Sequence, residues 1–336
     1  MRASHIGDFL LAVPALRAIR NSLPLAEIVF IGLPRVQLLA RRCQYITRFE
    51  LFPGFPGIAD QFYDARRTLA FLNRMQAEHF DLAVQMHGSG VYSNPFTLLL
   101  GARVTAGFTR PEDTGSGLDF GLVYPDQGYE IHRLLSLASF LGAAPCGDHL
   151  EFPLLAEDWA ELVEWSELSG VHNDRPILAI HPGAEVKAKR WPADRFGLAG
   201  RELASHFALV PVVTGLAAER ELTAEVAAII GPRAIDLAGR LSLGGLGALL
   251  SRTRLLLTND TATAHIAYAL GTPSVTIFGP QDATRWGPLD PEGHRVVSHS
   301  VECRPCDHGR CPGDHRRMDG IGVAEVIQAA GALLTA

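Results

Sequence analysis

The sequence lacks the features that mark several large classes of protein. It has no uninterrupted apolar run of about 18 residues, so we expect no membrane-spanning helix. Asp8 and Pro14 interrupt the apolar stretch near the N-terminus, which argues against a signal peptide. No G-x-G-x-x-G follows a first strand and no G-x-x-x-x-G-K-[ST] occurs, so neither a Rossmann dehydrogenase nor a P-loop enzyme is supported. Internal repeats and low-complexity tracts are also missing, which favours an enzyme over a scaffold.

Cysteine is scarce, and the five cysteines cannot all pair with one another. Cys43 and Cys146 stand alone, which favours free thiols in a reducing compartment, and we expect a cytoplasmic protein. The motif Cys303-x2-Cys306-x4-Cys311-x3-His315 holds four soft ligands within a span short enough for zinc. We favour free thiols here, with a bound metal as the alternative.

Length and charge indicate a two-domain globular protein. The 336 residues exceed one ordinary core, and 47% hydrophobic with 20% charged residues is typical of a soluble protein. The net charge of −6 is uneven: residues 1–110 carry 12 Lys+Arg against 7 Asp+Glu, which leaves 18 against 29 in the remainder. A basic N-terminal part suits a phosphorylated or membrane-borne anionic partner, although an uneven solvated surface explains it equally well. We expect no nucleic-acid partner.

Apolar patterns predict strands that alternate with helices, which indicates βαβ units and parallel sheets. The alternation pauses at a polar segment, 159–173, so we place a domain boundary near 170, with a closing helix after 321. The expected strands are 28–32, 49–52, 81–86, 104–107, 177–180, 208–213, 235–237, 255–257 and 274–278. The expected helices are 8–20, 34–42, 65–79, 131–141, 194–206, 218–230, 243–251, 262–270 and 323–334.

The stretch 254–280 is central to the functional interpretation. Asp260, Thr261 and Thr263 follow a buried strand and begin a helix, and His265 lies one turn on. Ligands of parallel sheets bind beyond the carboxyl ends of the strands, where helix N-termini present N–H groups to anions. Simple capping of the helix by Asp260 or Thr261 is the alternative.

Two further strand ends carry polar residues. His181-Pro182-Gly183-Ala184 is followed by Lys187, Lys189 and Arg190, which fits a diphosphate site, with a solvated basic turn as the alternative. After the next strand, Gly215 precedes Glu219, a carboxylate placed to receive ribose hydroxyls or merely to begin a helix.

The chain opens with Ser4-His5-Ile6-Gly7-Asp8. Gly7 permits a tight backbone, and Asp8 lies where the first helix begins. As a functional residue Asp8 would be a general base. As a structural one it would be a carboxylate favoured by the helix dipole.

Together these blocks resemble glycosyltransferase family 9, the lipopolysaccharide heptosyltransferases. The matching blocks are GDFLLAVPALRAIR from Gly7, HPGAEVKAKRWPADRF from His181, the long block from Asp236 to Pro280, and the weaker CRPCDHGRC from Cys303. The resemblance implies a GT-B fold, in which two Rossmann-like doubly wound domains face one another across a cleft. Residues 1–170 would bind the acceptor, 171–320 would bind the nucleotide sugar, and the helix within 321–336 would pack back on the first domain.

The resemblance also implies roles for individual residues. Asp8 matches the catalytic base of an inverting heptosyl transfer, beside acceptor-binding Ser4, His5 and Gly7. Lys189 matches the lysine that binds the donor diphosphate. The donor set is completed by Gly183, Gly215, Glu219, Asp260, Thr261, Ala262, Thr263 and His265.

The implied donor is ADP-heptose, with no metal required, and the implied acceptor is a lipid-linked glycan, the lipopolysaccharide inner core. We expect a monomer at the cytoplasmic face of the inner membrane. The alternatives are a family member that uses another nucleotide sugar for a different glycan, and a catalytically silent binding homologue.

Three departures from the family pattern bear on those alternatives. About five residues of strand that normally precede the Gly7-Asp8 turn are missing, through a misassigned start or a lost strand that would weaken the sheet. Ala262 replaces a usual glycine, and Ala184-Glu185 replaces a pair that bears hydroxyl groups in well-known members.

Overall fold

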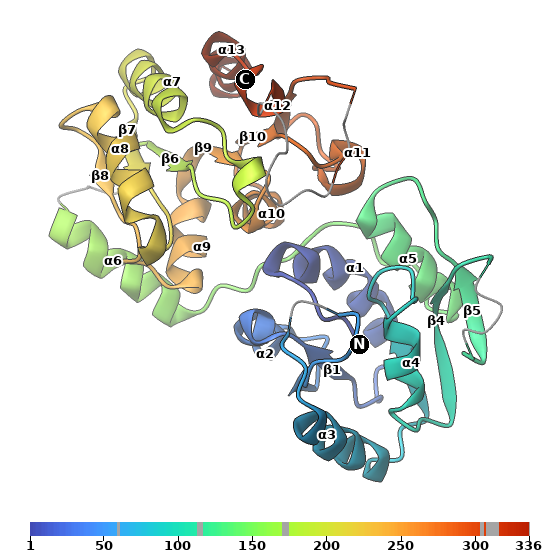
Figure 1. Cartoon of the computed structure of the whole chain (residues 1–336). Helices are drawn as coiled ribbons and strands as arrows, with labels where there is room; N and C mark the ends of the chain where they lie inside the picture. Colours follow the sequence, from blue (N-terminus) through green and yellow to red (C-terminus); the bar gives the residue numbers. More distant parts are fainter. Residues whose placement is uncertain (59–60, 113–116, 170–174, 303–305, 307–315, 336) are drawn as a thin grey trace. The chain divides into compact units, whose positions relative to one another are not determined.

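The chain forms two compact units, Met1–Pro153 and Leu154–Ala336, in each of which parallel strands alternate with helices (Figure 1). The computed structural model describes residues 1–58, 61–112, 117–169, 175–302, 306 and 316–335. The α/β class is therefore confirmed. The division lies ahead of the expected boundary near 170, because the segment read there as polar contains helix α6 (Ala156–Ser169), whose Leu162 and Trp165 join the core of the second unit.

The second unit is built on a six-stranded parallel sheet in the order β11-β10-β9-β6-β7-β8. Leu255, Leu256 and Leu257 of β9 are fully buried, as expected of a strand with both faces of its sheet covered. The strands are β6 (Ile177–His181), β7 (Val210–Val213), β8 (Ile235–Asp236), β9 (Thr253–Asn259), β10 (Ser274–Phe278) and β11 (His294–Ser298).

Helices cover both faces of this sheet. One core contains side chains of α7, α8 and α13 packed on the strands, and a second contains side chains of α6 and α9. Helix α13 packs on α7 and on β9, β10 and β11, all within the second unit, and its expected packing on the first domain stays a prediction. The helices are α7 (Ala193–His206), α8 (Arg220–Ile230), α9 (Leu243–Ser251), α10 (Ala262–Leu270), α11 (Ala283–Trp286), α12 (Arg316–Asp319) and α13 (Val323–Leu334), with short 3₁₀ turns η2 (Lys187–Lys189) and η3 (Ala217–Glu219).

The strand order places a topological switch point between β6 and β9. The chain leaves β6 towards β7 and β8 on one side, and it fills the other side with β9, β10 and β11. Connections from neighbouring strands diverge at such a point and leave a crevice outside the carboxyl ends, which is where doubly wound sheets bind ligands. The candidate site in this unit should therefore follow His181 and Asn259.

The first unit has two small parallel sheets, β1-β2 and β3-β4-β5, between which residues 1–4 run. The Arg2 N–H donates to the Ile31 carbonyl of β1 (3.0 Å), and the Met86 N–H, just after β3, donates to the Met1 carbonyl (3.0 Å). Residues 1 and 2 thus take the position of a central strand, and the strand order matches that of the second unit. A lost strand was one expectation; residues 1 and 2 fill its position, although they form no regular strand.

The elements of the first unit follow the expected alternation, with one addition. The region read as a loop, 109–128, contains the edge strand β5, which pairs with β4. The strands are β1 (Val29–Gly32), β2 (Arg48–Leu51), β3 (Leu82–Gln85), β4 (Val104–Thr109) and β5 (Phe120–Val123). The helices are α1 (Ile6–Ser22), α2 (Gln37–Arg42), α3 (Ala65–Ala77), α4 (Ser93–Leu98) and α5 (Glu130–Phe140), with the 3₁₀ turn η1 (Pro34–Val36).

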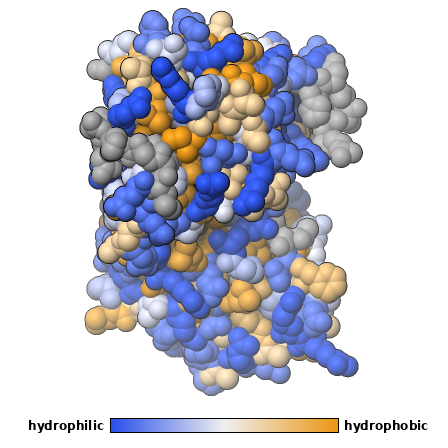
Figure 2. All heavy atoms as spheres, turned by 90° about the vertical axis from the view of Figure 1, so that its left-hand side faces the viewer, coloured by the Kyte–Doolittle hydropathy of each residue, from blue (hydrophilic) through white to orange (hydrophobic). Residues whose placement is uncertain are grey.

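On the face drawn in Figure 2, hydrophobic side chains are interspersed with hydrophilic ones. Among the described residues, no helix is both long and apolar enough to span a bilayer.

Candidate functional site

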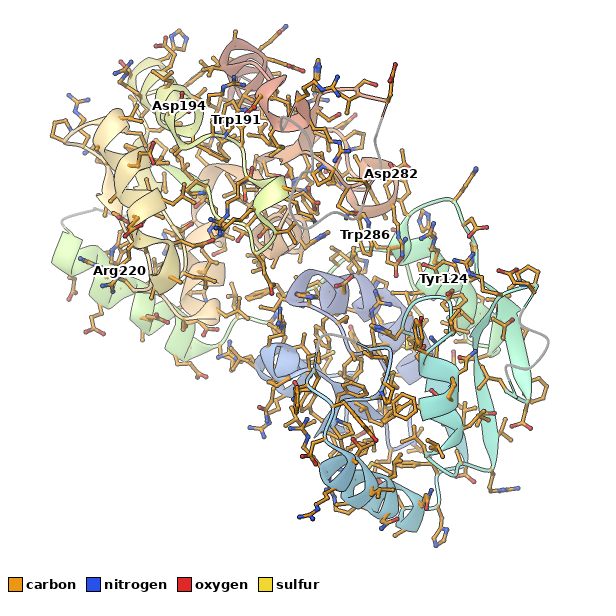
Figure 3. All side chains as sticks on the ribbon, viewed as in Figure 1. Tyr124, Trp191, Asp194, Arg220, Asp282 and Trp286 are labelled. Atoms are coloured by element: carbon orange, nitrogen blue, oxygen red, sulfur yellow. The ribbon has the colours of Figure 1, made fainter. Side chains whose placement is uncertain are left out.

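Asn259, the last residue of β9, fixes the loop that follows β6. Its side chain is fully buried. The amide nitrogen donates to the Pro182 carbonyl (2.8 Å), and the amide oxygen accepts from the Trp191 N–H (3.0 Å). The Trp191 ring packs edge-on against Phe196, and its indole N–H donates to the Ile321 carbonyl (3.1 Å). Figure 3 labels Trp191 among the side chains of the second unit. Both ends of the loop 182–191 are therefore held at the switch point.

That loop brings Lys189 to Asp260. The Lys189 ammonium lies 2.7 Å from Asp260 Oδ2, and Asp260 is 3% exposed. Lys189 remains partly accessible, with 21% of its side chain exposed. An ammonium held by a buried carboxylate but open on one side can contact an anion without a change in its own position. The structure thus brings together two residues that lie 71 positions apart in the sequence.

The N-terminus of helix α10 lies at the same strand end. Thr261 is the N-cap, and its hydroxyl accepts from the Thr263 N–H (3.3 Å), so the capping interpretation is confirmed for Thr261. Thr263 and His265 are buried, with the His265 ring edge-on to Tyr268, and Ala262 is half-buried. The first N–H groups of a helix carry a partial positive charge, so they add to the attraction that Lys189 exerts on an anion.

A second cluster surrounds the Glu219 carboxylate, which is almost completely buried. Its Oε1 pairs with the Arg190 guanidinium (3.2 Å), and its Oε2 accepts from the Leu216 N–H (2.9 Å). A Cβ at Gly183 would lie 2.3 Å from Oε2, so any larger residue there would displace the Glu219 carboxylate. Gly215 lies beside the same cluster, where a Cβ would meet Thr223 Cγ2 at 2.8 Å.

His181, the last residue of β6, is neutral at neutral pH. Burial lowers its pKa to about 4, and the Glu219 carboxylate, which raises the pKa, offsets this only in part. The ring nitrogen Nδ1 lies 3.0 Å from the Thr214 hydroxyl. His181 therefore binds β6 to the end of β7 without adding a positive charge to the strand end.

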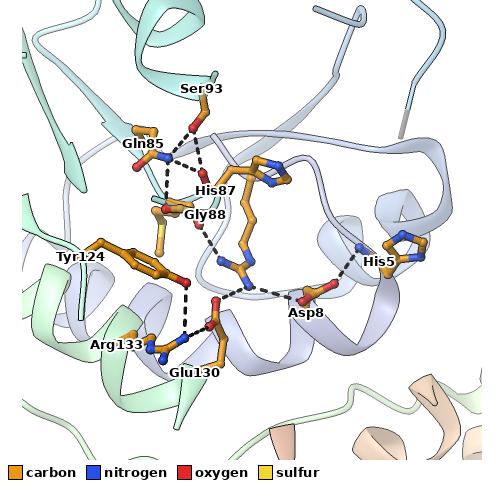
Figure 4. A network of polar contacts seen from close by, with 11 residues as sticks. His5, Asp8, Gln85, His87, Gly88, Ser93, Tyr124, Glu130 and Arg133 are labelled. Atoms are coloured by element: carbon orange, nitrogen blue, oxygen red, sulfur yellow. Dashed lines mark hydrogen bonds and ion pairs between the residues drawn. The ribbon is translucent and has the colours of Figure 1, made fainter. Parts of the chain in front are cut away.

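In the first unit, Asp8 lies in the first turn of α1. Its Oδ2 accepts from the His5 N–H (3.2 Å), and its Oδ1 lies 3.6 Å from the Arg2 guanidinium (Figure 4). Asp8 therefore acts as a capping carboxylate, yet 24% of its side chain is exposed, which leaves it accessible to a ligand. Ser4 and Gly7 are buried, and the His5 ring lies 2.7 Å from Arg35.

The cysteine-rich segment is described at one position only. Cys303, Cys311 and His315 lie outside the described residues, and Cys306 accepts from the Arg317 guanidinium (2.7 Å). Among the residues that the structure describes, no group of three or more His, Cys, Asp or Glu side chains is arranged to hold a metal ion.

Two features of the site were missed in the sequence. Asn259 directly precedes the predicted Asp260, and an amide at the end of an apolar strand was the available signal. Arg190 was noted as part of a basic turn, but nothing in the sequence indicated that it pairs with Glu219, 29 residues on.

Comparisons with known proteins agree with the resemblance. The family model described as Glycosyltransferase family 9 (heptosyltransferase) matches residues 68–316. Lipopolysaccharide heptosyltransferase 2 of Escherichia coli is 28% identical over 218 residues, 61% of this chain and 61% of its own length. Lipooligosaccharide heptosyltransferase 2 of Campylobacter jejuni is 28% identical over 169 residues, 49% of this chain and 53% of its own. The matched stretch thus spans little more than half the length of these relatives.

Solved structures extend the likeness of fold to the whole chain. A glycosyl transferase of family 9 from Veillonella parvula superimposes with a TM-score of 0.83 at 20% identity, covering 99% of this chain and 95% of its own. An Escherichia coli heptosyltransferase with ADP gives 0.73 at 17% identity, covering 99% and 98%. The fold is therefore GT-B, with two Rossmann-like domains, and the chain belongs to glycosyltransferase family 9, the heptosyltransferase family.

Proposed function

We propose that this protein is an inverting glycosyltransferase that transfers a heptose from ADP-heptose to the inner core of lipopolysaccharide. Membership of the family and the names of the relatives support the heptosyl donor. The protein would act on a lipid-linked glycan at the cytoplasmic face of the inner membrane, as a monomer. Of the two units, the second would bind the donor and the first the acceptor.

The ion pair of Lys189 with Asp260, beside the N-terminus of α10, is the observation that carries the donor half of this proposal. Departure of a nucleoside diphosphate leaves negative charge on its oxygens, and positioned cations and helix N–H groups stabilise such charge. Lys189 and the first turn of α10, with Thr261, Ala262 and Thr263, would provide this stabilisation without a metal.

Nucleoside recognition would fall to the cluster around Glu219. Its carboxylate oxygens retain acceptor capacity beyond the bonds to Arg190 and Leu216, since a carboxylate offers about four acceptor positions. The two ribose hydroxyls could donate to them at the close approach that Gly183 and Gly215 permit.

Asp8 would be the general base. A partly exposed carboxylate, one oxygen of which is oriented by the His5 N–H, can take the proton of an acceptor hydroxyl as that hydroxyl attacks the anomeric carbon. Ser4, His5 and Gly7 would border the acceptor, and His265 the donor.

The lysine content of the chain allows a direct test of donor binding. Lys187 and Lys189 are the only two lysines, and Lys187 is exposed. Reductive ¹³C-methylation should therefore give two lysine signals in a carbon-correlated NMR spectrum, apart from that of the α-amine. We expect ADP to shift the Lys189 signal much more than that of Lys187, and ADP-heptose to compete with ADP for the same site.

Variants assign the signals and test the roles. Lys189→Met should weaken ADP binding by about 10-fold or more, the usual worth of a charge-assisted hydrogen bond, whereas Lys187→Met should bind normally. A larger response to UDP or GDP than to ADP would identify a member that uses another nucleotide sugar. Equal shifts of both lysine signals would contradict a phosphate role for Lys189.

Asp8→Asn separates an enzyme from a silent binding homologue. We expect kcat for transfer to fall about 10²- to 10⁴-fold, the usual contribution of a general base, with ADP affinity unchanged. A wild-type protein that binds ADP-heptose without transferring or hydrolysing it would instead be a silent homologue.

A further inference from the structure

Asp8 ends a chain of alternating charges that passes through the interior of the first unit. The Arg2 nitrogen Nη2 lies 3.6 Å from Asp8 and 3.0 Å from Glu130 Oε1. The other oxygen of Glu130 lies 3.4 Å from the Arg133 guanidinium. Figure 4 shows this network, in which Glu130 and Arg133 of α5 are linked through Arg2 to Asp8 of α1.

The network is buried except at Asp8. The side chains of Arg2, Glu130 and Arg133 are 3–4% exposed, against 24% for Asp8. Charges at such depth persist only when they are paired and hydrogen-bonded, and the loss of one leaves its partner uncompensated. A change in the charge of Glu130 therefore alters the pairing of Arg2. Through Arg2 it also alters the pairing of Asp8, the member of the network that a ligand can reach.

A backbone carbonyl and the Tyr124 side chain hold the far end of the network. Arg133 donates to the Asp126 carbonyl (2.6 Å) and to the Tyr124 hydroxyl (3.3 Å), and its guanidinium lies 5.2 Å from the centre of the Tyr124 ring. Glu130 is the first residue of α5, so its backbone is fixed by the helix. These anchors hold the Glu130 carboxylate in place opposite Arg2.

The guanidinium of Arg2 is consequently divided among several acceptors. Nη1 donates to the Met86 carbonyl (2.5 Å), and Nη2 is closer to Glu130 than to Asp8. Arg2 therefore cannot turn into a close two-point pair with Asp8. It orients Asp8 Oδ1 from a distance and leaves that oxygen able to accept a proton.

We propose that Glu130 and Arg133 are positioning residues for the base, and that Glu130 prevents Arg2 from closing on Asp8. The proposal rests on the role proposed above for Asp8. Without the Glu130 charge, Arg2 would close on Asp8, and the carboxylate would become both misoriented and a poorer proton acceptor. Donor binding should be unaffected, because the candidate donor residues all belong to the second unit.

The test compares Glu130→Gln with a matched control, Glu151→Gln. Glu151 also pairs with a buried arginine of the first unit, Arg17, but it lies outside the ion pairs that join Arg133, Glu130, Arg2 and Asp8. We expect Glu130→Gln to lower kcat for transfer about 10- to 100-fold with the donor KM almost unchanged. A displacement of the reacting carboxylate by about 1 Å would have an effect of this size. Glu130→Asp should restore much of the rate, and Glu151→Gln should leave kcat and KM as they are.

A second background distinguishes positioning from a general loss of structure. If Glu130 acts through Asp8, Glu130→Gln should cause no further loss of rate in a protein that already carries Asp8→Asn. An equal loss in both backgrounds would overturn the proposal. If Glu130→Gln fails to fold, the charge-balanced double variant Glu130→Gln/Arg133→Gln takes its place in both backgrounds.

The outcomes also separate this proposal from the one on which it rests. Transfer that slows with Asp8→Asn but not with the Glu130 variants overturns the positioning role alone. If the wild-type protein showed no transfer, or if Asp8→Asn reacted at the wild-type rate, both the role of Asp8 as the base and the positioning role of Glu130 would be refuted.

Discussion

Gly183 lies where the loop after β6 passes close to a buried carboxylate, and a side chain at this position would collide with it. A Cβ would lie 2.3 Å and 2.4 Å from the two oxygens of Glu219. Glu219 cannot retreat freely, because Arg190 and the Leu216 N–H hold those oxygens. Arg190 itself donates to the Ala184 carbonyl (2.8 Å), so a single methyl group would disturb the loop and the carboxylate together.

We therefore expect Gly183→Ala to destabilise the second unit by about 1–3 kcal/mol, the usual cost of overpacking. If Glu219 binds the ribose, ADP affinity should also fall by about 10-fold, the equivalent of one hydrogen bond. Chemical denaturation and calorimetric titration measure the two effects. Gly322→Ala is the matched control, because that position has open space and an ordinary backbone. A Gly183→Ala protein as stable as the control would contradict the close approach.

At the scale of residues, the sequence indicated what is local and missed what is distant. Lys189 and Asp260 could be predicted because each follows a strand end in a recognisable block. The pairing of Arg2 with Glu130 joins residues 128 positions apart, and no local pattern carries it. Asn259 has a local signal, but its two bonds to the loop depend on the order of the strands.

The C-terminal end of β6 contributes to stability in a pH-dependent way. Burial lowers the pKa of His181 from 6.5 to about 4, so the unfolded chain takes up the proton first as the pH falls. The contribution of His181 to the unfolding free energy is therefore fully present above pH 6.5 and is lost progressively as the pH falls to about 4. The shift corresponds to about 3 kcal/mol of unfolding free energy.

The difference between the wild type and His181→Gln isolates this contribution. Carboxylates and other histidines titrate in both proteins, so we expect them to cancel in the difference. The wild-type unfolding free energy should fall more steeply than that of the variant between pH 6.5 and 4, as measured by urea denaturation. Parallel curves would mean that His181 takes up its proton as readily in the folded state as in the unfolded chain.

At the scale of elements, strongly apolar segments could be predicted from the sequence, whereas segments with a largely exposed face, such as α6 and β5, could not. Strand β9 was predicted because Leu255, Leu256 and Leu257 are continuous. Helix α6 was read as polar because its exposed face is acidic, and Leu162 and Trp165 reveal their role only against α9. The edge strand β5 has a largely exposed pattern that resembles a loop in sequence.

At the scale of the whole molecule, the chain forms two units with the same strand order, and each has hydrophobic cores of its own. In the first unit, one core forms around Phe52, Phe71 and Phe96 and another between α1 and α5. The cores of the second unit flank its six-stranded sheet. Because a ligand stabilises only what it binds, donor binding should raise the stability of the second unit selectively.

The aromatic residues allow each unit to be followed by itself. All four tryptophans, Trp159, Trp165, Trp191 and Trp286, belong to the second unit, whereas five of the six tyrosines belong to the first. Tryptophan fluorescence therefore reports the unfolding of the second unit, while circular dichroism reports both.

We expect ADP at 100 times its dissociation constant to stabilise the fluorescence transition by about 2.7 kcal/mol. A second component, seen by circular dichroism and carried by the first unit, should keep its midpoint. In Lys189→Met the fluorescence shift at the same ADP concentration should shrink, since the stabilisation depends on the affinity. If ADP moved the component without tryptophan signal and left the fluorescence transition in place, the nucleotide would bind the first unit, and the proposed assignment of donor and acceptor to the two units would be reversed.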